Sequence, residues 1–361
     1  MFDHYGNSLR KGVRSVYADD SDNPLSHRLQ ANVSRFAAYK AYHVTSAVKA
    51  VLNDVEIPLK DREKYARETL KTFDRWHDTE CNTTVARSRT AKQFAEYMQP
   101  DNLRLFPNLR WLPSRSVILR ESHIPYYNRV WPKTDAFWAS NAPGSPWGCK
   151  CDTEETDEGA TDNDKVPSIT YPAGLEGNPY FTGEIFTDRA SYIVKSGKQS
   201  FNEIAKCYFT DSKSSLQISV LAHADELSEN IRTGRILAKK EDVIIRPHFT
   251  EDRIKNPEFE INGLKADAKR VEVYKGIKYG FKAALEQKCK IVIIDFDKNM
   301  RDISIKPGEV AKYLDWRKDD FSSGAIEKCY LIHNGSTVMI DKTITGRDNL
   351  KREVEKIKLK E

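Results

Sequence analysis

The stretch Asn256–Lys269, NPEFEINGLKADAK, decides the fold of the second half of the chain. Two short strand-like runs, residues 258–261 and 264–273, flank Asn262-Gly263. Asn-Gly between such runs is a strong short-range signal for a β-hairpin. Shortly after it comes KIVIIDF, residues 290–296, a continuous apolar run typical of a strand that is buried on both faces. The sequence therefore predicts a mixed β-sheet here.

Helices and further strands surround this hairpin. Apolar spacing predicts helices at residues 225–240, 274–287 and 309–314. A strand is expected at residues 242–246, and a second hairpin, 328–332 with 337–340, surrounds Asn334-Gly335. Residues 219–345 thus form an α/β domain, and the charged tail 346–361 is expected to be a frayed helix.

The first 150 residues have a different pattern, rich in aromatic and arginine side chains. Apolar residues recur at helical spacing over 29–51, 61–76 and 79–97. Two short extended segments are expected at 106–111 and 116–119. The fold class that follows is an α+β multidomain protein, with an α-rich N-terminal domain and a C-terminal α/β domain built on a mixed sheet.

The two domains are expected to be joined by residues 151–218. The run from Cys151 to Lys165, CDTEETDEGATDNDK, carries seven acidic residues and no large apolar side chain. Such a run buries too little apolar surface to offset its ordering entropy, which predicts a solvated linker. The following stretch, to about Phe209, is punctuated by Pro and Gly and is expected to be rich in loops.

Composition excludes several classes of protein. The 361 residues are 39% hydrophobic and 31% charged, with a net charge of +5 from 58 basic and 53 acidic side chains. This mixed charge gives little support to nucleic-acid binding through bulk charge, although a local basic patch stays open. No run of about 18 apolar residues is present, so we expect no membrane partner, and Met1–Lys11 lacks the apolar core of a secretory signal. Six cysteines in a chain of this length do not indicate a disulfide framework.

Two of these cysteines, Cys149 and Cys151, are candidates for chemistry. Three tryptophans and several prolines precede them within about thirty residues, as does His123. Two thiolates and an imidazole are ligands for Zn²⁺, although the usual spacing between paired cysteines is two to four residues. Spacing alone leaves two alternatives open: a Zn²⁺ site formed by the three residues, or a strand on which the cysteines simply pack.

A second candidate site lies on the hairpin. Glu258 follows Pro257, and Asp267 and Lys269 lie two apart on the return strand, where alternation puts them on one face. Two carboxylates from paired strands can hold a Mg²⁺ ion that polarises a phosphate, while the lysine orients the attacking water. Glu229, on the preceding helix, is expected to complete this catalytic group. A salt-bridged, solvent-facing hairpin is the alternative.

A metal-independent ribonuclease is a competing prediction. In that case His223 or His248 would be the general acid or base, and Lys269, Arg270 or Arg246 would stabilise the transition state. A structural role for a single histidine after a strand is also open. Basic residues that follow the hairpin could bind nucleic acid or could form a solvated helix face; they are Arg270, Lys275, Lys278 and Lys282.

The segment Ser114–Cys151 resembles the signature of the phage Mu F-like minor head proteins, the head-morphogenesis family. The matching residues include Arg120, His123, Asp135, Phe137-Trp138, Pro143, Pro146 and Trp147-Gly-Cys-Lys-Cys151. Weaker agreement extends at most over residues 25–195. Gly144-Ser145 separates two prolines that are adjacent in the family, and the acidic run after Cys151 is not part of its pattern. The resemblance implies an assembly role in the virion, with the portal and major capsid proteins as partners and synthesis in the host bacterial cytoplasm.

The region from Asp225 to Ile340 resembles the tRNase domains of contact-dependent-inhibition toxins and, in its hairpin, the PD-(D/E)xK nucleases. The residues that carry this resemblance are Ser228-Glu-Asn230, Asn256-Pro-Glu-Phe with Ile261-Asn-Gly263, and Asp267-Ala-Lys269. Glu258 stands where Asp is usual, and Asp267 where Glu is commoner. The resemblance implies a toxin-type nuclease, with tRNA or DNA as substrate, carried behind the head domain. The rival hypothesis is a catalytically inactive packing or nucleic-acid-binding module.

Overall fold

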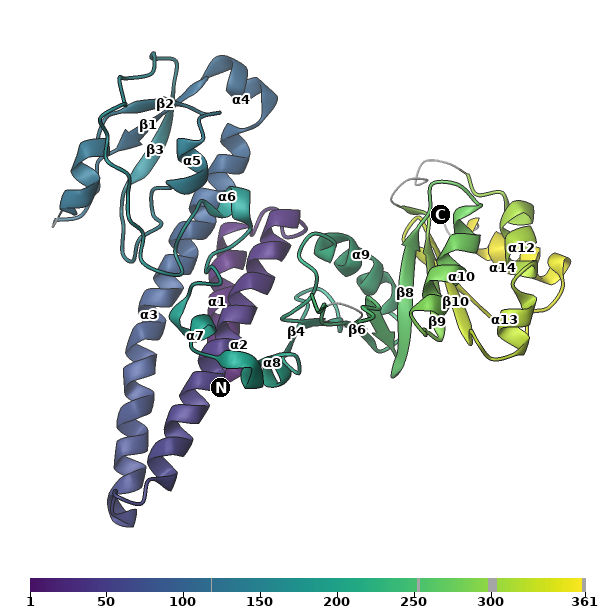
Figure 1. Ribbon diagram of the computed structural model, residues 1–361. Helices are drawn as coiled ribbons and strands as arrows, with labels where there is room; N and C mark the ends of the chain where they lie inside the picture. Colours follow the sequence, from purple (N-terminus) through teal and green to yellow (C-terminus); the bar gives the residue numbers. More distant parts are fainter. Residues whose placement is uncertain (118, 252–253, 298–303, 359–361) are drawn as a thin grey trace. The chain divides into compact units, whose positions relative to one another are not determined.

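The protein consists of two compact units, Met1–Cys207 and Tyr208–Glu361, in a computed structural model (Figure 1). The structure describes residues 1–117, 119–251, 254–297 and 304–358. The first unit is largely helical and the second is built on a mixed sheet, so the predicted α+β class is confirmed.

Three long helices form the core of the first unit: α1 (Phe2–Val16), α2 (Pro24–Asn53) and α3 (Leu59–Tyr97). Helix α2 begins five residues before the predicted range, at Pro24, where the Asn23 side chain accepts hydrogen bonds from the amides of Leu25 and Ser26. Helix α1 was not predicted. Its buried face is spaced by four residues, through Tyr5, Leu9 and Val13.

Buried charges also hold this unit together. Lys40 of α2 is fully buried and pairs with Glu80 of α3 at 2.6 Å. Arg87, also buried, donates to the backbone carbonyls of Leu175 and Gly177, at 2.9 and 3.1 Å. The Pro/Gly-rich stretch is therefore an ordered loop whose carbonyls are satisfied by a buried guanidinium.

A three-stranded antiparallel sheet, in the order β2-β1-β3, follows α3. Its strands are β1 (Asn108–Leu112), β2 (Val130–Pro132) and β3 (Asp152–Thr156). The prediction of a solvated linker at the start of the acidic run is wrong, because residues 152–156 form strand β3. Arg110 pairs across the sheet with Glu154 at 2.8 Å, and buried Lys133 pairs with Glu155 at 2.5 Å. Basic partners from other segments neutralise the acidic strand.

Short helical turns complete the unit. They are α4 (Pro100–Leu105), η1 (Glu121–Tyr126), α5 (Phe137–Ser140), α6 (Pro179–Thr182), α7 (Ser191–Val194) and α8 (Gly197–Ile204). The aromatic side chains around the small sheet form one buried cluster, which includes Trp111, Tyr126, Trp131 and Trp138. Residues 116, 117 and 119 are irregular rather than extended, and residue 118 lies outside the described residues.

The second unit is an eight-stranded mixed sheet, in the order β11-β10-β9-β8-β7-β6-β5-β4. The strands are β4 (Tyr208–Thr210), β5 (Gln217–Ser219), β6 (Val243–Ile245), β7 (Phe259–Ile261), β8 (Leu264–Arg270), β9 (Ile291–Asp295), β10 (Lys328–His333) and β11 (Ser336–Asp341). Both predicted hairpins are present, and Asn262 and Gly263 have the positive φ angles, 49° and 80°, that the tight turn requires. Strands β4 and β5 lie in the stretch that was expected to be a connector.

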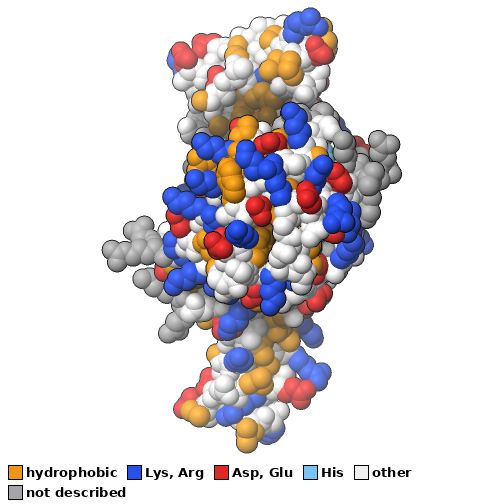
Figure 2. All heavy atoms as spheres, turned by 90° about the vertical axis from the view of Figure 1, so that its right-hand side faces the viewer, with side chains coloured by type: hydrophobic (Ala, Val, Ile, Leu, Met, Phe, Trp, Pro, Cys, Tyr) orange, Lys and Arg blue, Asp and Glu red, His pale blue; other side chains and the backbone are white. Residues whose placement is uncertain are grey.

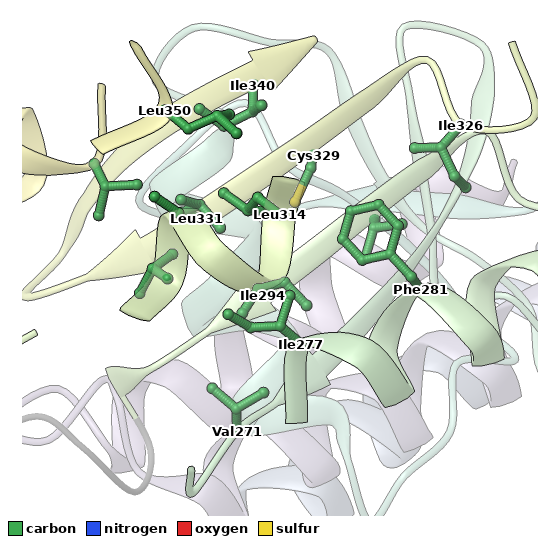
Figure 3. Close-up of a cluster of buried hydrophobic side chains, with 14 of the residues drawn as sticks. Val271, Ile277, Phe281, Ile294, Leu314, Ile326, Cys329, Leu331, Ile340 and Leu350 are labelled. Atoms are coloured by element: carbon green, nitrogen blue, oxygen red, sulfur yellow. The ribbon is translucent and has the colours of Figure 1, made fainter. Parts of the chain in front are cut away.

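Helices cover both faces of this sheet (Figure 1). Helix α9 (Leu227–Leu237) lies on one face, where Thr233 donates to Asp295 of β9. The opposite face carries α10 (Gly276–Glu286), α12 (Pro307–Asp315), α13 (Lys318–Ser322) and α14 (Arg347–Lys358). Figure 3 shows apolar side chains of α10, α12 and α14, among them Ile277, Leu314 and Leu350, gathered around Ile294 of β9 and Leu331 of β10.

The tail is part of this core. Residues 347–358 are helical, as expected, but they are not frayed. Leu350, Val354 and Ile357 are buried, at spacings of four and three residues. The charged residues between them occupy the outer face of α14, so the alternating charge is one face of an amphipathic helix.

The surface agrees with the mixed charge of the sequence. Figure 2 shows Lys and Arg side chains interspersed with Asp and Glu over the face of the second unit that is turned to the viewer. Within the described ranges, every helix is either too short or too polar to cross a bilayer.

The approach of α10 to the sheet leads to a stability prediction. A Cβ at Gly280 would lie 2.7 Å from Cδ1 of Ile294 and 3.0 Å from Cβ of Lys269. Alanine is favoured over glycine in a helix by about 1 kcal/mol, but overpacking costs about 1–3 kcal/mol. We expect Gly280→Ala to lower the free energy of unfolding by about 1 kcal/mol in denaturant titration.

Gly308→Ala is the matched control. Gly308 lies in α12, and a Cβ there would meet no atom within 4 Å, so this change should be neutral or stabilising. Equal effects of the two substitutions would show that α10 is not packed closely on β8.

Candidate functional site

Polar side chains gather at one edge of the large sheet. Strands β5, β6, β8, β9 and β10 all run in the same direction, so their carboxyl ends meet at that edge. The residues at or just after these ends are His223, His248, Arg270, Asp295 and His333. Ligands of open α/β sheets bind outside the carboxyl ends of the strands, so this edge is the candidate functional site of the second unit.

Glu258 lies at this edge, immediately before the first residue of β7. Phe259 is paired with Ala266, so one step further along the ladder places Glu258 opposite Asp267 of β8. The Glu258 side chain is 17% exposed, and its Oε2 atom has no hydrogen-bond partner in the described part of the chain. Burial raises the pKa of Glu258 to about 8, the Arg270 guanidinium opposes this shift, and the neighbouring charge of Asp267 adds to it.

Asp267 lies on the face covered by α10. Gln287, just after that helix, donates to its Oδ1 atom at 2.7 Å. Burial raises the pKa of Asp267 to about 6, although the Gln287 hydrogen bond and the Lys269 charge oppose the shift. Lys269 shares this face and is exposed, which keeps its amine accessible to a ligand. The structure thus brings together the three predicted hairpin residues.

Glu229 occupies a different position. It lies on α9, on the opposite face of the sheet, with its carboxylate 3.5 Å from Arg232 and 3.8 Å from Nε of Arg270. Arg270 in turn lies 4.0 Å from Glu258 and donates to Asn230 at 2.5 Å. Glu229 is therefore connected to Glu258 through a guanidinium. Among the described His, Cys, Asp and Glu side chains of this unit, no three lie close enough to hold one ion.

The two histidines of the competing prediction lie side by side. The rings of His223 and His248 are 4.4 Å apart, centre to centre, and Nδ1 of His223 lies 3.6 Å from Glu226. Burial, followed by the charge of His223, lowers the pKa of His248. Arg246 is held instead by Glu260, at 2.9 Å.

The predicted nucleic-acid-binding residues do not form one patch. Lys275, Lys278 and Lys282 are exposed, at or just before the start of α10 and along its outer face. Arg270 is largely buried against α9 and is engaged with Asn230.

A separate centre lies in the first unit, where the structure brings His123, Cys149 and Cys151 together. Their ligand atoms all lie within 4.8 Å of one another, and Nδ1 of His123 is 3.4 Å from Cys151 and 3.6 Å from Cys149. His123 is on η1, and the cysteines immediately precede β3 rather than lying on a strand. This buried group could bind a metal ion.

The pKa values of the two thiols, Cys149 and Cys151, are shifted in opposite directions. A hydrogen bond from Cys151 lowers the pKa of Cys149, against the effect of burial, and His123 adds to the lowering. The same interaction raises the pKa of Cys151. A metal ion that binds this group would displace the thiol protons.

Two residues that act on the predicted acidic side chains were not predicted. Gln287 holds Asp267 from the far end of a helix, and Glu226 lies near enough to shift the pKa of both Glu258 and Asp267. Glu226 immediately precedes α9 and lies three residues before Glu229, so its position at a helix start was the one available signal. No family model, curated protein or solved structure matches this chain.

The raised pKa of Glu258 predicts a pH-dependent stability. The folded-state pKa, about 8, is higher than the ordinary value of 4.5, so the folded protein holds a proton that the unfolded chain releases between these values. Stability must therefore fall as pH rises from about 4.5 to 8, by roughly 2–4 kcal/mol from this group. Glu258→Gln should reduce that slope in denaturant titrations from pH 5 to pH 8 without divalent cations.

The pKa of Asp267 is also raised, so the stability of the Glu258→Gln variant should still decrease somewhat as pH rises. Glu286→Gln, at a side chain on α10 that is 60% exposed, is the control and should keep the full slope. A slope that Glu258→Gln leaves unchanged would mean that Glu258 is solvated in the folded protein.

Proposed function

We propose that the second unit is a metal-dependent nuclease that cleaves RNA, with its catalytic centre at Glu258, Asp267 and Lys269. The observation that carries this proposal is a largely buried carboxylate, Glu258, that has an unpartnered oxygen in the described structure and lies opposite the buried carboxylate of Asp267. Such a pair is unfavourable unless a proton or a cation neutralises it. The hairpin resemblance to PD-(D/E)xK nucleases and toxin tRNases supports the cation and the substrate class.

The donor set suits Mg²⁺. This ion takes oxygen ligands and typically uses one or two carboxylates, with water and substrate phosphate as the remaining ligands. Glu258 and Asp267 supply two carboxylates, so a third acidic ligand is not required. When bound, the ion polarises the scissile phosphate and lowers the pKa of a water ligand.

The protein's own residues would then position the substrate. The Lys269 amine, on the same strand face as Asp267, would hold the attacking water by a hydrogen bond. Arg270, fixed by Asn230 and close to Glu258, would stabilise negative charge on the phosphate. The exposed lysines of α10 would contact the nucleic-acid backbone.

The metal requirement is testable with the full chain. We expect cleavage of tRNA in Mg²⁺, loss of cleavage with a chelator, and a decrease of at least about 100-fold in Asp267→Asn, measured by gel-based rates. DNA is the parallel substrate. Asp319→Asn, at an exposed position of α13, is the control and should retain the wild-type rate.

The ring contact between His223 and His248 supports a second mechanism, in which RNA is cleaved without a metal ion. A histidine pair beside Glu226 could perform acid–base chemistry without a metal. Cleavage that survives both the chelator and Asp267→Asn, and is lost in His248→Ala, would replace the metal proposal with this one. No cleavage in any condition would favour an inactive packing or nucleic-acid-binding module.

We propose further that the chain is a phage minor head protein, with the portal and major capsid proteins as partners in the virion. What supports this is the Mu F-like signature of residues 114–151. In this proposal the first unit attaches the second to the head, which delivers the nuclease with the genome. Cofractionation of the chain with purified phage heads tests it, and a chain found only outside the particles would contradict it.

The third proposal is that His123, Cys149 and Cys151 bind Zn²⁺. Two thiolates and an imidazole are soft and borderline ligands that suit Zn²⁺ better than Mg²⁺. The ion would tie η1 to the segment that leads into β3.

Purified protein should contain about one zinc per chain by elemental analysis, and Cys151→Ser should lose most of it. Cys207→Ser is the matched control, because Cys207 lies outside the metal group. Equal zinc contents in the two variants would contradict the assignment.

A further inference from the structure

The metal group of the first unit has one ligand too few for a closed site. Structural zinc is almost always held by four protein ligands, whereas three protein ligands leave a position for water or another ligand. The described part of this unit supplies three such ligands, His123, Cys149 and Cys151. The nearby Asp152 is held elsewhere, because its Oδ1 accepts from Gln93 at 3.3 Å and from the amide of Thr153 at 2.8 Å.

The open position faces a cavity. Cys149 and Cys151 line a cavity of about 590 Å³, between the middle of α3 and the loop that precedes β3. His123 is 1% exposed and lies on the inner side, against Trp111 of the aromatic cluster. An ion held by the three residues would therefore be closed on the imidazole side and reachable on the thiolate side.

The walls of this cavity are basic. Arg89, Arg115 and Lys150 line it, all three are exposed, and none of them forms an ion pair with a described carboxylate. Asp152 is the acidic residue in the lining. Two thiolates neutralise the charge of a Zn²⁺ ion, so the remaining charge around the open position is positive.

One residue of the cavity lining has a buried hydroxyl without a partner. Thr83 of α3 lines the same cavity and is 2% exposed, yet its Oγ1 has no hydrogen-bond partner in the described structure. Buried hydroxyl groups are normally hydrogen-bonded, so a side-chain rotation that turns this hydroxyl toward the cavity would let it donate to a ligand there.

We propose that the metal centre is an anion-binding site, in which a small oxyanion of the phosphate type occupies the fourth position. Arg89, Arg115 and Lys150 would attract the anion, and Thr83 would donate a hydrogen bond to it. This proposal rests on the zinc assignment above. It concerns binding at the first unit and is independent of the nuclease centre.

Cobalt substitution tests it on the full chain. Co²⁺ bound to two thiolates gives visible absorption bands that respond to a change of the fourth ligand. We expect about one Co²⁺ per chain and a saturable change of the bands as inorganic phosphate is added, with sodium chloride of equal ionic strength as the reference. The double variant Arg89→Ala, Arg115→Ala should weaken the phosphate response about tenfold while leaving the affinity for Co²⁺ unchanged.

Two further variants test whether the phosphate response depends on the cavity residues or on surface charge in general. Thr83→Val, which preserves side-chain shape, should weaken the phosphate response without loss of Co²⁺, whereas Arg104→Ala, on exposed α4, should change neither. If the chain binds Co²⁺ but its absorption bands do not change when phosphate is added, the anion-site proposal is wrong and the zinc proposal stands. Failure to bind Co²⁺ or Zn²⁺ would overturn both.

Discussion

The main physical constraint on the candidate site of the second unit is a pair of acidic side chains opposite each other, the largely buried Glu258 and the buried Asp267. Both pKa values are raised, and one oxygen of Glu258 lacks a partner in the described structure. A fold selected for stability alone would not gain from such a pair, because burial of a charge costs several kcal/mol unless it is compensated. A proton or a bound cation can compensate such a pair, and the surrounding Lys269 and Arg270 are groups that bind phosphate.

The two candidate centres differ in the chemistry of their donors. The sheet edge offers carboxylate oxygens next to basic side chains, which suits a hard cation and a phosphate substrate. The centre of the first unit offers two sulfurs and an imidazole, which suits zinc. Each centre lies within one compact unit, so each can be tested by substitutions that leave the other intact.

Local patterns in the sequence predicted most elements of the second unit but failed where partners come from distant segments. The hairpin around Asn262-Gly263 and the buried strand β9 were predicted correctly, because turn chemistry and apolar runs are local signals. Residues 152–156, which form strand β3, were expected to be part of a solvated linker. This expectation failed because the acidic side chains of the strand pair with Arg110 and Lys133, which lie on other segments. The candidate residues His123, Cys149 and Cys151 were identified from residue type, but their convergence was not established by spacing.

By itself, the sequence determined the α+β class, the order of most strands and helices in the second unit, and the residue types able to bind metal or phosphate. These follow from hydrophobic period, turn residues and side-chain chemistry, which are properties of short segments. Only the tertiary structure decided that Glu258 lies opposite Asp267, that Glu229 meets Arg270 instead, and that His223 touches His248. Burial and strand register set these relations, and both depend on residues far apart in the chain.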